Sequence, residues 1–252
     1  MGTWLLLGTV VCLGAAIWWF ARSTLALELA WIGVAIAVAL HLLLKFQFVA
    51  VACQHLVDER NNGTLELLLS TPLSVPEILK GQWMALRRQF AGPVAAVLIL
   101  DAGVFASIFL SESQTPAGMR VLRDVWLPIF LGEMTMLMAD LIALGWTAMW
   151  TAMTVKQPNH AAGTAAGRIL LLPWLIFVFS WVSFMTVGSV SGAFRRSEPE
   201  LWAALLWWFL VGIVNNWLYA THARKKLLAH FRLRATERFQ AQKTRGFWWS
   251  AS

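Results

Sequence analysis

Residues 90–110 read FAGPVAAVLILDAGVFASIFL, an apolar run that contains one charged residue, Asp101. A helix of about 20 predominantly apolar residues is long enough to cross the hydrocarbon core of a bilayer. Runs of comparable hydrophobicity lie at 3–21, 27–44, 125–153, 169–187 and 201–219. The sequence therefore predicts an all-α fold: a polytopic membrane helix bundle with about six transmembrane helices.

The composition supports a membrane protein and argues against a soluble domain. Of the 252 residues, 59% are hydrophobic and 13% are charged, whereas soluble domains carry about 25% charged residues. The net charge of +7 does not indicate nucleic-acid binding, because most of the excess lies in one C-terminal stretch beside an apolar run. We expect a transmembrane domain over 1–220 and a basic cytoplasmic tail over 221–252.

The tail has helical patterning as well as basic charge. Leu227, Leu228, Phe231 and Phe239 fall roughly on one helical face, which suits an amphipathic helix lying on an anionic leaflet. A disordered tail that only sets the topology is the alternative.

The distribution of Lys and Arg predicts the orientation, since cytoplasmic loops of membrane proteins are enriched in these residues. If the connection between the second and third spans is cytoplasmic, fifteen of the 20 basic residues are inside, Lys45 among them. This bias predicts that both termini are cytoplasmic, in a multi-pass protein of the cell inner (plasma) membrane.

The longest predicted connection runs over 45–89, and its segment 54–89 has a helical pattern of its own. Asn61-Asn62-Gly63 is a turn signal, and the residues after it predict a short helix over 64–70 that ends at Thr71-Pro72. A second short helix is expected to begin with a capping box formed by Ser74 and Glu77 and to end near Gly81. Helices this short are not stable alone in water, so we expect them to pack on the bilayer surface or on another protein.

Residues 59–81, ERNNGTLELLLSTPLSVPEILKG, resemble the signature of ATP-binding cassette (ABC) type-2 transporter permeases. Two predicted spans precede this motif and four follow it, as in that family. The resemblance implies that the segment contains the coupling helix that docks on a cytoplasmic ATPase subunit. The docking residues that it implies are Glu59, Gly63, Thr64, Leu65, Glu66, Leu68, Leu69, Thr71 and Pro72.

Two features depart from the family pattern. Gln82 stands where the family usually has Lys, and the connection over 22–26 is shorter than in many members. The second departure leaves two alternatives open for the chain, a complete permease subunit and one half of a fused permease.

The resemblance also implies partners for the chain, and the sequence indicates that ATP is hydrolysed by one of them. The chain would be the permease subunit of an ABC exporter, paired with itself or with a sister permease in the bilayer. The sequence has no Gly-x-x-x-x-Gly-Lys-Ser/Thr phosphate loop, so ATP-Mg is expected on the separate ATPase. No cofactor, catalytic residue or metal ligand is expected in this chain.

Asp101, Glu133 and Asp140 fall inside predicted spans. Acids at membrane depth are costly and by default suggest function. Glu133 and Asp140 are seven residues apart, so they share one helical face, and all three acids are candidates for a translocation path or a proton or cation site. Each acid could instead be paired with a polar group on a neighbouring helix. These acids leave two rival functions open: a membrane-embedded enzyme and an ion-coupled carrier.

Overall fold

The computed structural model describes residue 8 and residues 26–112, 116–155, 157–190 and 201–236, which are almost entirely helical. The all-α prediction is therefore confirmed for this part of the chain. The elements in order are α2 (Ala26–Asn61), α3 (Thr64–Leu69), α4 (Val75–Glu112), α5 (Pro116–Val121), the π-helical turn η1 (Leu122–Trp126), α6 (Leu127–Thr154), α7 (Pro158–Ala166), the π-helical turn η2 (Gly167–Leu171), α8 (Leu172–Val190) and α9 (Leu201–Thr236).

Five segments of the described chain are long and apolar enough to cross a membrane. They are Gly33–Asn61, Val75–Leu110, Asp124–Thr154, Pro158–Ser189 and Trp202–Ala235. Each contains all or most of one of the last five predicted spans. The first predicted span, 3–21, lies outside the described residues except for Gly8, so the number six remains a prediction.

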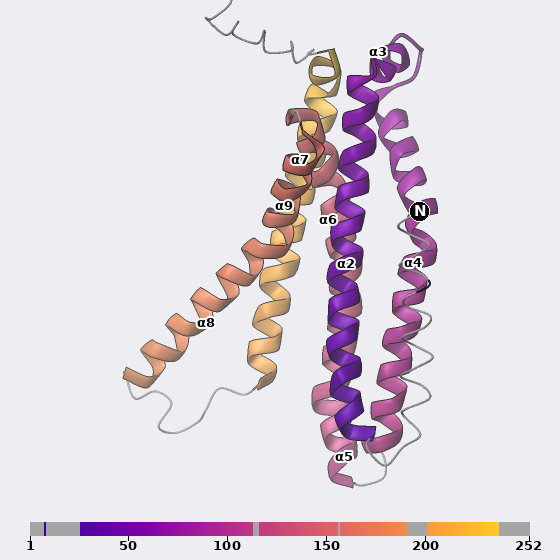
Figure 1. Ribbon diagram of the computed structural model, residues 1–252. Coiled ribbons are helices and arrows are strands. Elements are labelled where there is room, and N and C mark those ends of the chain that lie inside the picture. The colour runs from indigo at the N-terminus through magenta and orange to yellow at the C-terminus, as the bar shows by residue number, and fades with distance from the viewer. Residues whose placement is uncertain (1–7, 9–25, 113–115, 156, 191–200, 237–252) are drawn as a thin grey trace, which may run out of the picture.

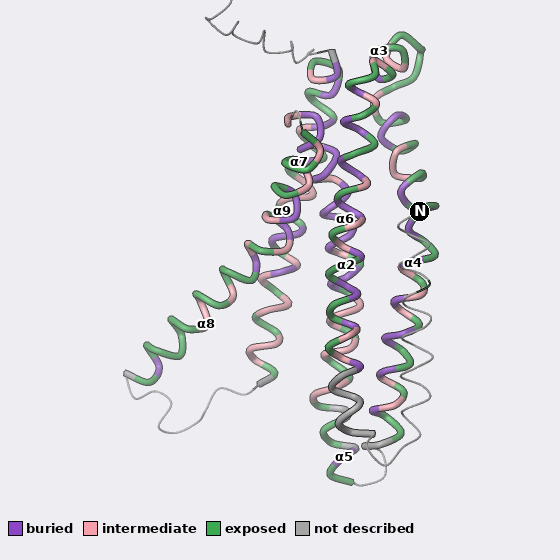
Figure 2. The backbone as a smooth tube through the Cα atoms, viewed as in Figure 1, coloured by how far each residue is buried: buried purple, intermediate pink, exposed green. Residues whose placement is uncertain are grey.

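The helices α2, α4 and α6 run side by side, and α9 packs along α6 (Figure 1). The helix α7 lies against α2 and α6, whereas α8 diverges from the bundle and packs mainly on α9. Most of α8 is consequently exposed (Figure 2). The end of α9 lies at the same end of the bundle as α3 (Figure 1), an arrangement that follows from the alternating direction of successive spans.

Two of the helices are longer than the sequence patterns predicted. The second span was expected to end at residue 44, but α2 continues to Asn61 and has 36 residues. The second short helix was expected to end near Gly81, but it is the first part of the 38-residue α4. The connection that was predicted to be long and cytoplasmic is thereby reduced to residues 62–74 around α3. At 1.5 Å per residue, α2 and α4 are about 54–57 Å long and exceed the roughly 30 Å hydrocarbon core.

Gly81 does not interrupt α4 because one glycine costs only about 1 kcal/mol relative to alanine, and the residues beside it are held by packing. Ile78 and Leu79 are buried just before it. Further along, Pro93 lies inside the helix, which is tolerated in membrane helices more readily than in water-soluble ones.

Aromatic packing joins the three central helices. The ring of Phe48 on α2 lies edge-on to Phe90 on α4, with centroids 5.0 Å apart. The indole of Trp83 on α4 lies against α6 at Gly145, where an added Cβ would be 2.5 Å from the Trp83 Cη2 atom. Gly145 is therefore needed for the close approach of α4 and α6 at this level.

The described part of the predicted tail is a continuation of α9, which passes residue 221 without a break. Leu227 and Phe231 are buried in the protein core, while Arg224 and Lys226 lie over the rings of Trp146 and Trp150 on α6, 5.6 and 5.5 Å from their centroids. This part of α9 therefore packs on α6, since cation–π contacts and apolar burial hold it there, whereas Leu228, from the same predicted apolar face, is 44% exposed. Phe239 and the rest of the tail lie outside the described residues.

Candidate functional site

A cluster of charged and polar side chains lies within the bundle, and α2 provides its central members. His41 and Lys45 are one helical turn apart, so they project from the same face of α2. The His41 Nε2 atom is 2.7 Å from Asp101 Oδ2 on α4, and its Nδ1 atom is 3.6 Å from Glu133 Oε1 on α6. One imidazole therefore connects two of the three acids singled out from the sequence.

The third acid belongs to the neighbouring half of the cluster. Lys45 Nζ lies 2.6 Å from Asp140 Oδ2, and Asn216 on α9 donates from Nδ2 to Asp140 Oδ1 at 2.5 Å. Both carboxylate oxygens of Asp140 are thus occupied. The prediction that Glu133 and Asp140 share a face of their helix is confirmed, because they meet residues one turn apart on α2.

The cluster has more acid than base. Its three carboxylates face one lysine and one histidine, so its formal charge is negative in either protonation state of His41 when the acids are ionised. Charges in such surroundings persist only when they are paired and hydrogen-bonded. Asp140 and one oxygen of Asp101 are paired at hydrogen-bonding distance. Glu133 is paired at the longer distance of 3.6 Å.

Sequence reasoning found the three acids but not their partners. The sequence analysis did not single out His41, and it placed Lys45 in the predicted cytoplasmic connection, although α2 extends sixteen residues beyond Lys45. The residues after Lys45, FQFVAVACQHLV, are still mainly apolar, so they were a signal that the helix continues past the charge. The i, i+4 spacing of His41 and Lys45 was a second signal.

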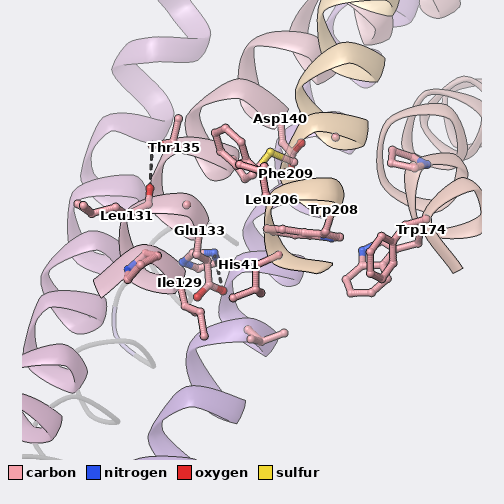
Figure 3. Close-up of a pocket in the computed structure, with 18 of the residues that line it drawn as sticks. His41, Ile129, Leu131, Glu133, Thr135, Asp140, Trp174, Leu206, Trp208 and Phe209 are labelled. Carbon is pink, nitrogen blue, oxygen red and sulfur yellow. Dashed lines mark hydrogen bonds and ion pairs between the residues drawn. The ribbon is translucent and has the colours of Figure 1, made fainter. Parts of the chain in front are cut away.

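A cavity of about 960 Å³ opens beside this cluster, between α2, α6, α8 and α9. Most of its lining is apolar and aromatic, and the charged residues on it are His41, Lys45, Glu133 and Asp140. Figure 3 shows Glu133 and His41 on one side and Trp174 and Trp208 on the other. Asp101 is not part of the lining, so the three acids do not form one continuous path wall.

The predicted coupling segment forms a compact corner between α2 and α4, which we call the α3 corner (residues 62–74). Gly63 ends α2 with a φ of +74°, a conformation that residues with a Cβ rarely adopt. Ser70 and Thr71 donate their hydroxyls to the carbonyls of Leu67 and Leu68, both at 2.6 Å. These bonds satisfy carbonyl groups that the end of a short helix would otherwise leave open.

The start of α4 is fixed in a similar way. The Glu77 carboxylate accepts hydrogen bonds from the backbone N–H of Ser74 at 2.7 Å and from its hydroxyl at 2.6 Å. The carboxylate part of the predicted capping box is therefore present, which explains why the chain turns sharply into α4 after Pro72.

The apolar face of α3 points into the protein and not away from it. Leu65 is 1% exposed, and Leu68 and Leu69 are partly buried against the core. Leu67 is 71% exposed and Leu73 is 43% exposed. Thr64, Thr71 and Pro72 are also exposed, so the outer surface of the α3 corner includes three of the predicted docking residues together with two leucines that the sequence analysis did not single out.

Two further contacts tie the corner to the bundle. Glu59 accepts a hydrogen bond from Gln82 Nε2 at 2.7 Å, which gives a role to the glutamine that departs from the family pattern. Arg60 donates to the carbonyls of Ala152 and Val155 at the end of α6, both at 2.8 Å. A cation is favourable at a helix C-terminus, so Arg60 links the end of α2 to the end of α6. The side chain of Glu66 lies outside what the structure describes.

Searches with models of known protein families, with curated proteins and with solved structures found no match to this chain.

Proposed function

We propose that this chain is the membrane permease subunit of an ABC exporter, coupled to a separate ATPase subunit through the α3 corner. The observation that carries the proposal is the continuity of α2 between that corner and the polar cluster. One uninterrupted helix holds Glu59 and Arg60 at the corner and His41 and Lys45 within the bundle. Force applied at the corner would therefore be transmitted to the ion pairs about 24 Å away along a rigid helix.

The outer surface of the corner supports docking. Leu67 and Leu73 are exposed apolar side chains on a short element whose inner face is already anchored by Leu65. Apolar side chains on a docked helix can fill a groove on a partner protein. The resemblance of residues 59–81 to the coupling segment of type-2 permeases supplies the identity of the partner, an ABC ATPase.

The mechanism that this proposal implies is mechanical, and the chain itself performs no covalent chemistry. Closure of the ATPase pair around ATP-Mg would displace the α3 corner. Arg60 would pass part of that displacement to α6, because it is bonded to the last carbonyls of that helix. Relative movement of α2 and α6 changes the cavity between them, since both helices line it.

Affinity purification from native membranes tests the proposal. A tagged chain extracted in mild detergent is expected to carry a second chain that contains a phosphate-binding loop, and the complex is expected to hydrolyse ATP. The purified chain alone is expected to hydrolyse none. Purification of an active transporter without any ATPase would contradict the proposal.

A second candidate function, an ion-coupled carrier, is favoured by the contact of His41 with two acids in the bundle. Histidine and carboxylate groups are the residues that proton relays use in membranes. In that case, uptake into vesicles that contain only this chain would respond to an imposed pH gradient in the absence of ATP. The ABC proposal expects no such response.

A further inference from the structure

The three acids of the polar cluster differ in how completely they are neutralised. Asp140 is bonded to Lys45 and Asn216, and Asp101 is 2.7 Å from His41. Among the residues that the structure describes, the Glu133 carboxylate has a polar contact only with His41, at the longer distance of 3.6 Å. Its side chain is 30% exposed, against 7% for Asp140 and 6% for Asp101. A molecule that entered the cavity would therefore meet Glu133 as the least neutralised acid.

Aromatic rings form the wall on the α8 and α9 side of the cavity. Trp174 on α8 and Trp208 on α9 have ring centroids 6.1 Å apart, and Phe177 is next to Trp174 at the same spacing. All three rings line the cavity. The faces of aromatic rings attract cations, most strongly for tryptophan and in surroundings shielded from water.

The rest of the cavity lining is mainly aliphatic and favours a ligand with bulky apolar groups. Aliphatic residues such as Val38, Leu42, Ile129 and Leu206 contribute to it, and the volume of about 960 Å³ is at the upper end of the range for small-molecule pockets, roughly 300–1,000 Å³. A small inorganic cation would find few oxygen ligands on these walls. An organic ion with apolar groups around its charge fits both the volume and the lining.

We infer that the cavity between α2, α6, α8 and α9 binds a hydrophobic organic cation, with Glu133 as its counter-ion and Trp174 and Trp208 as its aromatic wall. This inference deepens the proposed function, because it names the substrate class of the same membrane subunit. An organic anion of the same shape is disfavoured at the site, since the cluster has excess negative charge when its three acids are ionised. A lipid chain is uncharged, so it would gain no more from Glu133 than from an apolar residue at the same position.

Two ions of nearly equal size and opposite charge test the inference. The full chain is placed in phosphatidylcholine nanodiscs, and saturable binding of tetraphenylphosphonium and of tetraphenylborate is measured above the level in empty nanodiscs. We expect saturable binding of the phosphonium and none of the borate. Saturable binding of both ions, or of neither, overturns the inference, and this comparison requires no variant.

Substitutions then locate the site. Glu133→Gln is expected to weaken phosphonium binding about tenfold or more, because a charge-assisted contact contributes roughly 1.5–3 kcal/mol. Glu133→Asp keeps the charge and is expected to retain part of the affinity. Asp58→Asn, which removes an exposed acid at the far end of α2, serves as the matched control. Parent-like affinity in a monodisperse Glu133→Gln protein would show that the bound cation is not at this site and overturn the assignment.

These assays do not involve the ATPase, so their result is independent of the docking proposal. If an ATPase co-purifies but the phosphonium does not bind, the substrate class is wrong and the permease proposal stands. If the phosphonium binds with the expected selectivity but no ATPase is found, the cavity assignment stands and the carrier becomes the better description of the chain.

Discussion

Lys45 on α2 and Asp140 on α6 form an ion pair inside the helix bundle, with 2.6 Å between Nζ and Oδ2. The pair is shielded, since the two side chains are 13% and 7% exposed. It joins the helix that enters the α3 corner to the helix that receives Arg60. The same two helices are therefore connected at two levels, one at the corner and one beside the cavity.

The ion pair predicts a specific pattern of stability in single and double variants. Lys45→Met leaves the Asp140 carboxylate without its counter-ion in a buried position, and breaking a buried pair in this way costs about 3–5 kcal/mol. Lys45→Met with Asp140→Asn removes both charges and keeps an oxygen that can accept from Asn216. The double variant should recover most of the loss, as measured by unfolding in detergent.

The single and double variants together form a double-mutant cycle, which measures the interaction energy between positions 45 and 140. Independent sites give additive effects within about 0.5 kcal/mol. Additive losses for Lys45→Met and Asp140→Asn would mean that the two side chains do not interact in the membrane.

Arg60 predicts a local effect at the end of α6. Arg60→Ala removes two charge-assisted hydrogen bonds to the carbonyls of Ala152 and Val155, and we expect a loss of about 2–3 kcal/mol. Hydrogen exchange in the last turn of α6 should increase, while exchange in the middle of α6 should not. Arg60→Lys should fall between the parent and Arg60→Ala, because an ammonium group lacks the planar geometry that serves two acceptors.

Arg87→Ala is the comparison for Arg60→Ala, since Arg87 is an exposed arginine of α4. It should change stability by no more than about 0.5 kcal/mol. Equal exchange at the end of α6 in both variants would contradict the capping role of Arg60.

The orientation predicted from the Lys and Arg distribution can be tested by cysteine labelling. In a chain with Cys12 and Cys53 replaced by serine, a cysteine at exposed Ala117 on α5 should react with an impermeant reagent in intact cells. A cysteine at exposed Asn62 in the α3 corner should react only after permeabilisation. The reverse pattern would place the α3 corner outside and remove the basis for docking a cytoplasmic ATPase.

The two faces of α3 predict opposite results for two leucines. Leu65 is buried, so Leu65→Ala should destabilise the chain by about 2–5 kcal/mol. Leu67 is 71% exposed, so Leu67→Ala should change stability by no more than about 0.5 kcal/mol. Thermal unfolding of the two variants in the same detergent is the measurement, and a larger loss for Leu67→Ala would reverse the assignment of the inner and outer faces.

The fold class and the turns of the α3 corner could be predicted because they depend on local signals. Apolar run length indicates a membrane helix, Asn61-Asn62-Gly63 ends α2, and Ser74 and Glu77 start α4. The helix ends at 44 and 81 were placed wrongly for the opposite reason. Lys45 and Gly81 look like helix ends in the sequence. The ion pair of Lys45 with Asp140 allows α2 to continue, and the packing around Gly81 allows α4 to continue.

The candidate site was predicted only in part. Intramembrane acids are visible in a sequence because each is costly at that depth. Their partners are not visible, since contacts such as His41 with Asp101 join residues sixty positions apart. The direction of the α3 apolar face was also beyond the sequence, because the same leucine spacing fits a partner protein and the core of the chain itself.

Site-specific photo-crosslinking at position 67 tests the central claim, docking of an ATPase on the α3 corner. A benzoylphenylalanine in place of Leu67 is compared in native membranes with one in place of Leu43, an exposed residue near the middle of α2. The proposal predicts that position 67, and not position 43, crosslinks to a chain that contains a phosphate-binding loop. Absence of such a crosslink at position 67 in a stable, membrane-inserted protein, or an equal crosslink from position 43, would contradict it.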